Sequence, residues 1–219
     1  MTYRLYGVRD FANLAVHLAL DATGAPYEAI FLDPDDLKSP AHLARHPLGM
    51  VPMLETPDGP MIETAAILLW LADRHGGLAP APDSPDRAAF LSAFLFVTSN
   101  IHPATMDLLH PYRPAGEDQT RAVAMGGHAR LTTRLQVLEE MAARNPAWWQ
   151  PENPGILTFY LAMLTRWCRA FPVFPDLAVS LAAFPALHAR VAACEATPDV
   201  QRIAARHGLT GRFLTEPEG

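Results

Sequence analysis

Apolar and polar positions divide the chain into a first part with short strand-like runs and a second part with long helical ones. In the first part, residues 3–7 and 27–32 are short apolar runs typical of strands, and residues 14–22 between them have the amphipathic pattern of a helix. This β-α-β order predicts a parallel strand pair joined by a right-handed crossover. Residues 37–45 follow as a short helix or an irregular segment.

The next stretch, residues 45–71, organises the rest of the chain. Residues 51–54 form an apolar run that contains Pro52, which favours an edge strand or an entry from a special turn, and the Val51–Pro52 bond could be cis. The turn T-P-D-G-P and a second strand at residues 60–62 complete a hairpin. Glu63 and Thr64 then open a helix over residues 65–73. A helix start offers free backbone N–H groups and the positive end of a dipole, which together suit a carboxylate ligand.

Strand signals stop after a segment rich in Gly and Pro at residues 75–85, which reads as a linker. Five helical stretches are predicted beyond it: residues 86–109, 117–144 with a weak point at Gly126–Gly127, 154–170, 184–196 and 198–207. The stretch 154–170 is strongly apolar and is predicted at the centre of a bundle. We therefore expect an α/β domain at residues 1–76, a linker at 77–85 and an all-helical domain at 86–219.

Composition excludes several kinds of partner. The net charge is −6 and there is no basic tract, so we expect no nucleic acid partner. No apolar run reaches the ~18–20 residues of a membrane span, so we expect no membrane association. Cys168 and Cys194 form no C-x-x-C pair, which favours a reduced, cytoplasmic protein and argues against a thioredoxin or glutaredoxin type of dithiol oxidoreductase.

Two motifs in order resemble the glutathione S-transferase family. The family pattern N-P-x-G-x-V-P-x-L corresponds to H-P-L-G-M-V-P-M-L at residues 46–54, and E-S-x-A-I-x-x-Y-L corresponds to E-T-A-A-I-L-L-W-L at residues 63–71. Residues 184–201 resemble the family's penultimate helix, and parts of the chain are closest to the bacterial beta class. The resemblance implies a thioredoxin-like N-terminal domain, a helical-bundle domain that binds the acceptor, and a homodimer. It also implies glutathione as co-substrate, a small hydrophobic electrophile as acceptor, and no metal.

The resemblance assigns a clamp for glutathione. The backbone of Val51, before a cis Pro52, would pair with the cysteinyl backbone of glutathione. Glu63 would accept from the γ-glutamyl ammonium, and Thr64, in place of the usual Ser, would donate to its carboxylate, unless it is only a helix cap.

One position of the clamp departs from the family. Many members have a basic residue directly before V-P, where this chain has Met50. Lys38, Arg45 or His46 are candidates to replace that residue at the glycyl carboxylate.

The residue that would activate the thiol is the largest departure. A free thiol with a pKa near ~8.5 is only a few per cent ionised at neutral pH, so the family uses Ser, Cys or Tyr near the start of the first helix. The serine position falls near Asp10 and the beta-class cysteine position on Ala12. Asn13, through an amide hydrogen bond, and Tyr6, as an analogue of the tyrosine classes, are the catalytic candidates here. Their alternatives are a helix N-cap for Asn13 and a core or interface aromatic for Tyr6.

The helical part offers a third catalytic candidate. T-S-N-I-H-P-A at residues 98–104 resembles the beta-class T-S-E-L-H-K-G, whose histidine faces the sulfur and corresponds to His102. Pro103 replaces the lysine and is expected to kink the helix. We expect His102 to titrate between pH 6 and 8. Ser99, Met106 and the helix around Trp167 are expected to complete the acceptor pocket.

Other features leave the function open at this point. The family's S/T-x-x-D capping pattern falls on Gly155 and Thr158, so the capping box is lost. The missing Ser, Cys or Tyr favours a non-catalytic member that binds glutathione or a partner. A glutathione-dependent isomerase, lyase or dehalogenase is the other alternative, because the acceptor pocket rather than the clamp sets the reaction.

Overall fold

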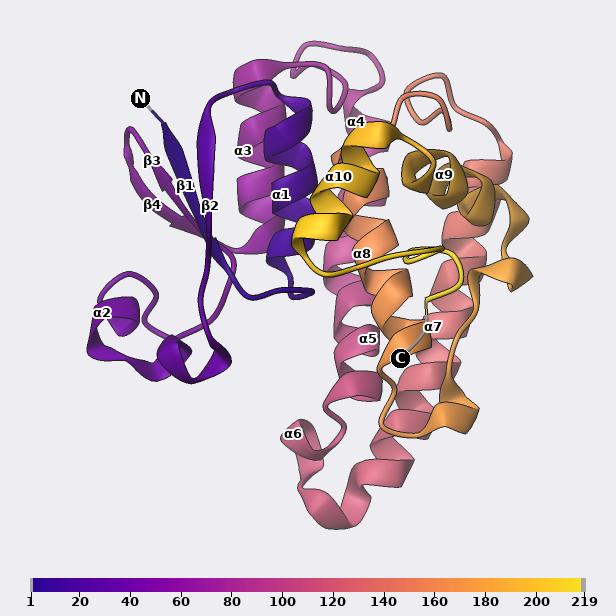
Figure 1. Cartoon of the computed structure of the whole chain (residues 1–219). Helices are drawn as coiled ribbons and strands as arrows, with labels where there is room; N and C mark the ends of the chain where they lie inside the picture. Colours follow the sequence, from indigo (N-terminus) through magenta and orange to yellow (C-terminus); the bar gives the residue numbers. More distant parts are fainter. Residues whose placement is uncertain (1, 218–219) are drawn as a thin grey trace.

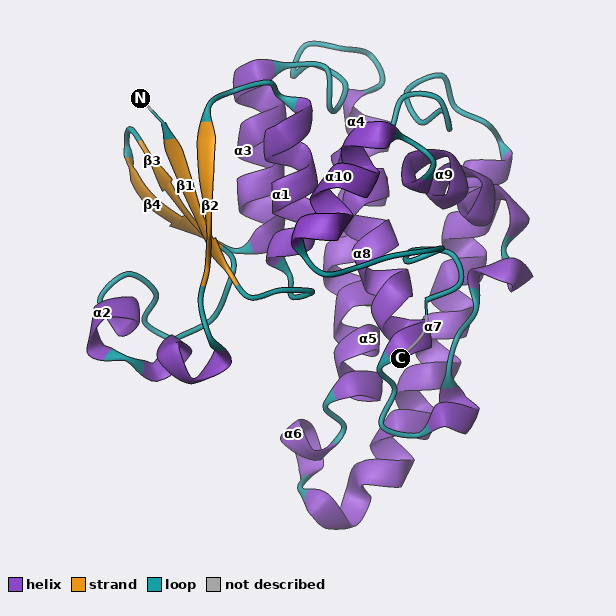
Figure 2. Ribbon diagram, in the orientation of Figure 1, coloured by secondary structure: helices purple, strands orange, loops and turns teal. Residues whose placement is uncertain are grey.

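Four strands form one sheet at the N-terminal end of the chain (Figure 2). They are β1 (Tyr3–Gly7), β2 (Tyr27–Phe31), β3 (Met53–Thr56) and β4 (Gly59–Ile62), in the spatial order β2-β1-β3-β4. β1 and β2 are parallel, whereas β3 is antiparallel to both β1 and β4. The computed structural model describes residues 2–217. Within them the predicted β-α-β unit, with a parallel pair, and the hairpin are confirmed.

Two helices cover one face of this sheet (Figure 1). α1 (Asn13–Ala22) and α3 (Thr64–His75) pack against each other, and their apolar sides, with Leu14 and Leu68, are almost fully buried. The segment predicted as a short helix or irregular consists of a 3₁₀ turn, η1 (Pro34–Lys38), and a single helical turn, α2 (Pro40–Leu43), outside the layers.

The rest of the described chain is helical. Its α-helices are α4 (Arg87–Phe96), α5 (His102–Leu109), α6 (Tyr112–Ala115), α7 (Thr120–Ala143), α8 (Ile156–Ala170), α9 (Pro185–Glu195) and α10 (Pro198–Arg206). Single turns η3 (Glu117–Gln119), η4 (Pro175–Leu177) and η5 (Leu181–Ala183) lie between them. α8 is buried along nearly its whole length and contacts α1, α3, α5 and α9, as its apolar sequence predicts. In residues 2–217 no single helix has the length and hydropathy of a membrane span, although the bent pair 175–183 and 185–195 passes on those two criteria together.

Of two predictions about helix continuity, the helical stretch 86–109 with a distortion at Pro103 is confirmed, whereas the weak point at Gly126–Gly127 is wrong. The stretch 86–109 is helical from Arg87 to Leu109 and contains a π-helical turn, η2 (Val97–Ile101), because Pro103 has no N–H for the carbonyl of Ser99 and the hydrogen-bond pattern changes there. Conversely, α7 runs without a break through both glycines at 126 and 127. A Cβ on Gly127 would lie 2.7 Å from the Cβ of Asp107, so this glycine lets α5 and α7 approach closely.

The linker takes over the role of the lost capping box. The carbonyl of Leu78 accepts a hydrogen bond from the N–H of Ile156 at 3.0 Å, and so caps the start of α8. A Cβ on Gly155 would lie 2.3 Å from that same oxygen, so only glycine permits this approach. Thr158 instead accepts a hydrogen bond from the indole of Trp149. The segment after α3 therefore joins the sheet part to the centre of the bundle.

Candidate functional site

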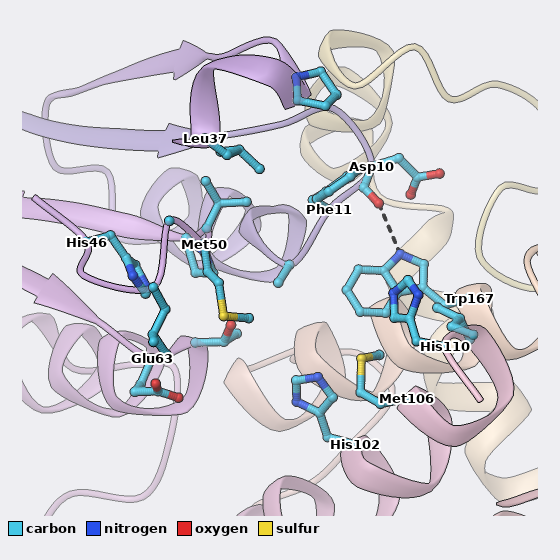
Figure 3. A pocket seen from close by; sticks show the side chains of 18 of the residues that line it. Asp10, Phe11, Leu37, His46, Met50, Glu63, His102, Met106, His110 and Trp167 are labelled. Atoms are coloured by element: carbon cyan, nitrogen blue, oxygen red, sulfur yellow. Dashed lines mark hydrogen bonds between the residues drawn. The ribbon is translucent and has the colours of Figure 1, made fainter. Parts of the chain in front are cut away.

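A pocket of about 780 Å³ lies between the sheet part and the helical part (Figure 3). Its lining from the N-terminal part comprises Arg9, Asp10, Phe11, Ala12, Pro34, Leu37, Lys38, His46, Leu48, Gly49, Met50, Val51, Pro52, Glu63 and Thr64. Its lining from the helical part comprises His102, Met106, Leu109, His110, Arg113, Trp167 and Phe171. We call the region around residues 46–52 and 63–64 the clamp side, and the region formed by the helical residues and the loop 9–11 the acceptor side.

The clamp side presents an unused stretch of backbone at Val51. The Val51–Pro52 bond is cis, and both residues line the pocket. Val51 lies before β3, and among the described residues neither its N–H nor its carbonyl pairs with another backbone group. A backbone donor and acceptor at a pocket wall need partners, so Val51 offers one hydrogen-bond pair to an extended peptide ligand.

The start of α3 adds a site for an amino-acid end group. Glu63 has φ 73° and ψ 112°, a sparsely populated conformation for a residue with a long side chain. Such strain persists where the surrounding structure enforces it and is concentrated at functional sites. The first hydrogen bond of α3 runs from Ile67 N–H to the carbonyl of Glu63, so the N–H groups of Thr64 and the next two residues have no acceptor in the helix. The Glu63 carboxylate suits an ammonium group, and the free N–H groups beside it suit a carboxylate. Together they match the two charged groups at the amino-acid end of a ligand.

The basic residue missing at Met50 has two candidate replacements in the pocket wall. The ammonium of Lys38 donates to the carbonyl of Leu48 at 2.8 Å, a neutral partner that leaves its positive charge uncompensated. His46 is almost fully buried, and its Nδ1 has no hydrogen-bond partner within residues 2–217. Burial lowers the pKa of His46, and the neighbouring His42 lowers it further, so its ring is neutral at pH 7. Lys38 is thus the cation on this side of the pocket.

Tyr6 and Arg45 lie outside the pocket lining. The Tyr6 hydroxyl donates to Glu55 at 3.2 Å, and the Arg45 guanidinium lies 5.1 Å from the centre of the Tyr6 ring. Burial and the Glu55 charge raise the pKa of Tyr6, so its phenol stays protonated. The structure brings neither residue to the site for which the sequence suggested them.

Asn13 is also absent from the pocket lining, because it is built into the interior. Its side chain is 1% exposed, and its Oδ1 accepts from the N–H of Val8 at 3.0 Å. Its amide fills the space above Gly7, where an added Cβ would lie 2.2 Å from Nδ2. The N-cap of α1 is Ala12, which makes no side-chain cap, so the N-cap alternative for Asn13 is wrong as well. Asn13 holds the turn between β1 and α1.

Asp10, at the expected serine position, is neutralised by α8. Its carboxylate forms two hydrogen bonds with Arg166, at 2.6 and 2.8 Å, and its carbonyl accepts from the indole of Trp167 at 3.1 Å (Figure 3). Asp10 has φ 60°, which is uncommon for a residue other than glycine. Sequence reasoning missed Arg166, because it comes from a predicted buried helix 156 residues away. The loop before α1 is therefore fastened to the helical part.

His102 reaches the pocket, and a tyrosine that the sequence did not single out orients it. The Tyr160 hydroxyl lies 2.6 Å from Nδ1 of His102, and burial raises the pKa of Tyr160, which keeps the hydroxyl protonated. Burial lowers the pKa of His102 to about 4. The expectation that His102 titrates between pH 6 and 8 is therefore wrong. Met106 and Trp167 line the pocket as predicted, whereas Ser99 does not.

The structure is thus a two-part protein, with a thioredoxin-like sheet domain, a helical domain and a pocket between these two domains. Residues 1–73 match the family described as glutathione S-transferase, N-terminal domain. Residues 1–73 are thus a glutathione S-transferase N-terminal domain, and the chain as a whole resembles proteins of that family, as the motifs predicted.

Individual relatives resemble the whole chain or its parts. The glutathione S-transferase GST-4.5 of Xanthomonas campestris is 27% identical over 213 residues, which cover 94% of this chain and 99% of that protein. The maleylacetoacetate isomerase of Rhizobium meliloti is 33% identical over 101 residues, which cover 43% of this chain and 46% of that one. A sphingomonad glutathione S-transferase, solved in complex with glutathione, has a TM-score of 0.74 and 29% identity over 94% of this chain and 100% of its own. The predicted α/β plus all-α class is confirmed by this fold.

Proposed function

We propose that this protein binds glutathione on the clamp side of the pocket and transfers its thiolate to a small electrophile on the acceptor side. The observation that carries the proposal is the clamp itself. It combines an unpaired backbone at Val51, a carboxylate on Glu63, whose backbone conformation is strained, and free N–H groups at the start of α3. Both regions open into one pocket whose opposite wall is helical.

Glutathione fits this clamp in one direction. Its γ-glutamyl ammonium pairs with Glu63, and the adjacent carboxylate accepts from the N–H groups and the hydroxyl at Thr64. Its cysteinyl N–H and carbonyl pair with Val51. Lys38 takes the glycyl carboxylate in place of the basic residue missing at Met50.

Thiolate stabilisation then falls to groups that line the opposite wall. In this proposal the Tyr160 hydroxyl, 2.6 Å from Nδ1 of His102, is the donor of their hydrogen bond, which puts the proton of the neutral imidazole on Nε2. An Nε2–H can donate a hydrogen bond to a sulfur anion. Because the pKa of His102 is about 4, its ring stays neutral and keeps this N–H throughout pH 6–8. On the N-terminal side of the pocket, the backbone N–H of Ala12, which has no backbone acceptor among residues 2–217, adds the positive end of α1.

Calorimetry with reduced glutathione tests the clamp. We expect Thr64→Ala to weaken binding by ~1–2 kcal/mol, the usual size of a hydrogen bond to a charged group. Thr133→Ala is the matched control, because Thr133 is an exposed residue of α7 that bonds only to the Ala129 carbonyl. An unchanged dissociation constant in Thr64→Ala, or no saturation of the wild type at millimolar glutathione, would rule out this clamp.

A glutathione-dependent isomerase is the second candidate, and the Rhizobium relative named maleylacetoacetate isomerase favours it. The two activities share the clamp and the thiolate and differ in whether the sulfur stays on the product. Mass spectrometry of products from a panel of alkenes and aryl halides separates them. If glutathione binds and nothing in the panel reacts, the protein is a non-catalytic member of the family.

We also propose that the protein is a cytoplasmic homodimer. Leu95 on α4 and Met125 and Val137 on α7 are exposed apolar side chains, which a self-complementary surface would cover. Both cysteines are free and buried, as in a reducing compartment. Light scattering at micromolar concentration should report twice the mass of the chain, and a monomer would contradict the proposal.

A further inference from the structure

Two arginines on the acceptor side of the pocket have no acidic partner. Arg9 comes from the loop after β1 and Arg113 from α6, and both line the pocket. Within residues 2–217 neither lies within 4.0 Å of a carboxylate. The guanidinium carbon of Arg9 lies 4.9 Å from the centre of the Phe31 ring, a contact that orients the group without neutralising it.

The acids of the pocket do not cancel these charges. The lining contains two carboxylates, Asp10 and Glu63. Asp10 is bound through both oxygens to Arg166, which is itself 5% exposed. Glu63 lies on the clamp side, where the γ-glutamyl ammonium would neutralise it. The acceptor side therefore carries uncompensated positive charge.

This concentration of cations runs against the composition of the chain. The protein has a net charge of −6, yet its pocket holds two unpaired arginines and Lys38, which is the only lysine in the sequence. A cleft lined by one sign of charge between low-dielectric walls focuses the field and attracts the opposite charge. An uncharged electrophile would gain no binding energy from the charges of these cations.

Apolar surface on the same side fits the body of an acceptor. Met106, Leu109, Trp167 and Phe171 form it together with Phe11. His110 also lines this side. Burial lowers its pKa, and Arg113 lowers it further, so it is a neutral polar group at pH 7. The acceptor side thus combines an apolar wall with two cations.

We propose that the preferred acceptor is a small electrophile that bears a carboxylate, held by Arg9 and Arg113 while its reacting carbon faces the thiolate near His102. This inference rests on the proposed function and specifies its substrate class. With an aryl chloride, the thiolate forms the C–S bond as the C–Cl bond breaks, and chloride leaves with the bonding pair. The proton lost by the thiol goes to solvent.

Matched ligands test the carboxylate directly. The ligands are the glutathione conjugates of 4-chloro-3-nitrobenzoate and of 4-chloro-3-nitrobenzamide. They differ only in one ring substituent, which is a carboxylate in the first and an uncharged amide in the second. Calorimetry on the full-length protein should show the carboxylate conjugate binding at least about tenfold more tightly at low salt. This ratio should shrink in 0.3 M NaCl, because exposed charges are screened there. Turnover of the two parent chlorides by the wild type should show the same order of kcat/KM.

Substitutions assign the preference to the two arginines. In Arg9→Gln/Arg113→Gln the ratio of the two dissociation constants should fall to about one. Arg144→Gln removes an exposed arginine outside the pocket lining and should keep the wild-type ratio. Equal binding of the two conjugates by the wild type, or a ratio that survives the double substitution, would overturn the inference while glutathione binding still stood. Failure of glutathione itself to bind would instead refute the proposed function and this inference with it.

Discussion

A chain of hydrogen bonds through two buried histidines should make the protein sensitive to mild acid. Asp10 N–H donates to Nδ1 of His207 at 3.1 Å, which fixes the His207 proton on Nε2. This Nε2–H donates to Nδ1 of His17 at 3.0 Å, and Nε2 on the other side of the His17 ring lies 3.1 Å from the Tyr27 hydroxyl and 3.3 Å from the Arg206 guanidinium. Tyr27 in turn donates to Asp21 at 3.0 Å. Because the Nδ1 atoms of both histidines accept hydrogen bonds, both imidazoles have to be neutral in this arrangement.

The size of the effect follows from the pKa values. Burial lowers the pKa of His17 to about 3, helped by its neighbour His207, and lowers the pKa of His207 to about 4. An unfolded histidine titrates near ~6.5, so below that pH the unfolded state binds more protons and the free energy of unfolding falls as the pH falls. Between neutral pH and pH 5, the free energy of unfolding should fall by ~2 kcal/mol for each histidine, or ~4 kcal/mol for the two together. The loss continues until the pH passes the two folded values.

Urea unfolding followed by tryptophan fluorescence, at pH 5.0 to 7.5 and constant ionic strength, measures this slope. In His17→Asn/His207→Gln the amides keep polar groups at both sites and do not titrate. The variant should be less stable at pH 7.5 but should lose ~4 kcal/mol less than the wild type between pH 7.5 and 5. His188→Gln on α9, outside the hydrogen-bond chain, is the control. If the double variant and the wild type showed the same pH slope, the reasoning would fail.

Three further changes give separate tests. Gly126→Ala should raise the free energy of unfolding by ~0.5–1 kcal/mol, because a helix-interior glycine is replaced where a Cβ meets only the flexible end of Arg130. Gly127→Ala should instead lower the free energy of unfolding by more than ~1 kcal/mol, because a Cβ there collides with α5. Urea titrations measure both variants, and equal effects of the two substitutions would contradict this packing. Tyr160→Phe should reduce kcat/KM about tenfold and raise the apparent pKa of the bound thiol in the pH–rate profile, with little change in glutathione affinity, because only the orientation of the imidazole proton is lost.

Residues close together in the sequence were the predictable part of the site. The hairpin with Pro52, the helix start at Glu63 and Thr64, and the histidine before Pro103 are local signals, and each lies in the pocket wall. The strands and most helices were predictable for the same reason, since their periodicity is carried within a few turns.

Residues that act through distant partners were not predictable. Asn13 has the chemistry of a thiol activator, but the neighbouring Gly7 leaves room for its amide to turn inward to Val8. Tyr6 faces Glu55 across the sheet instead of the pocket. The neutral state of His102 depends on burial by α8, which no local pattern encodes.

The sequence by itself predicted the resemblance to the glutathione S-transferase family, the two-part architecture and the residues proposed for the clamp, because these follow from short motifs and from hydrophobic periodicity. Tertiary structure alone decided which polar side chains face the pocket and which charges remain there. Asp10 is neutralised by Arg166 from α8, whereas Arg9 beside it has no acidic partner among the described residues. The physical reason is that burial and electrostatic pairing depend on which helices pack together. Such packing brings together residues that are more than a hundred positions apart in the sequence, as Asp10 and Arg166 are.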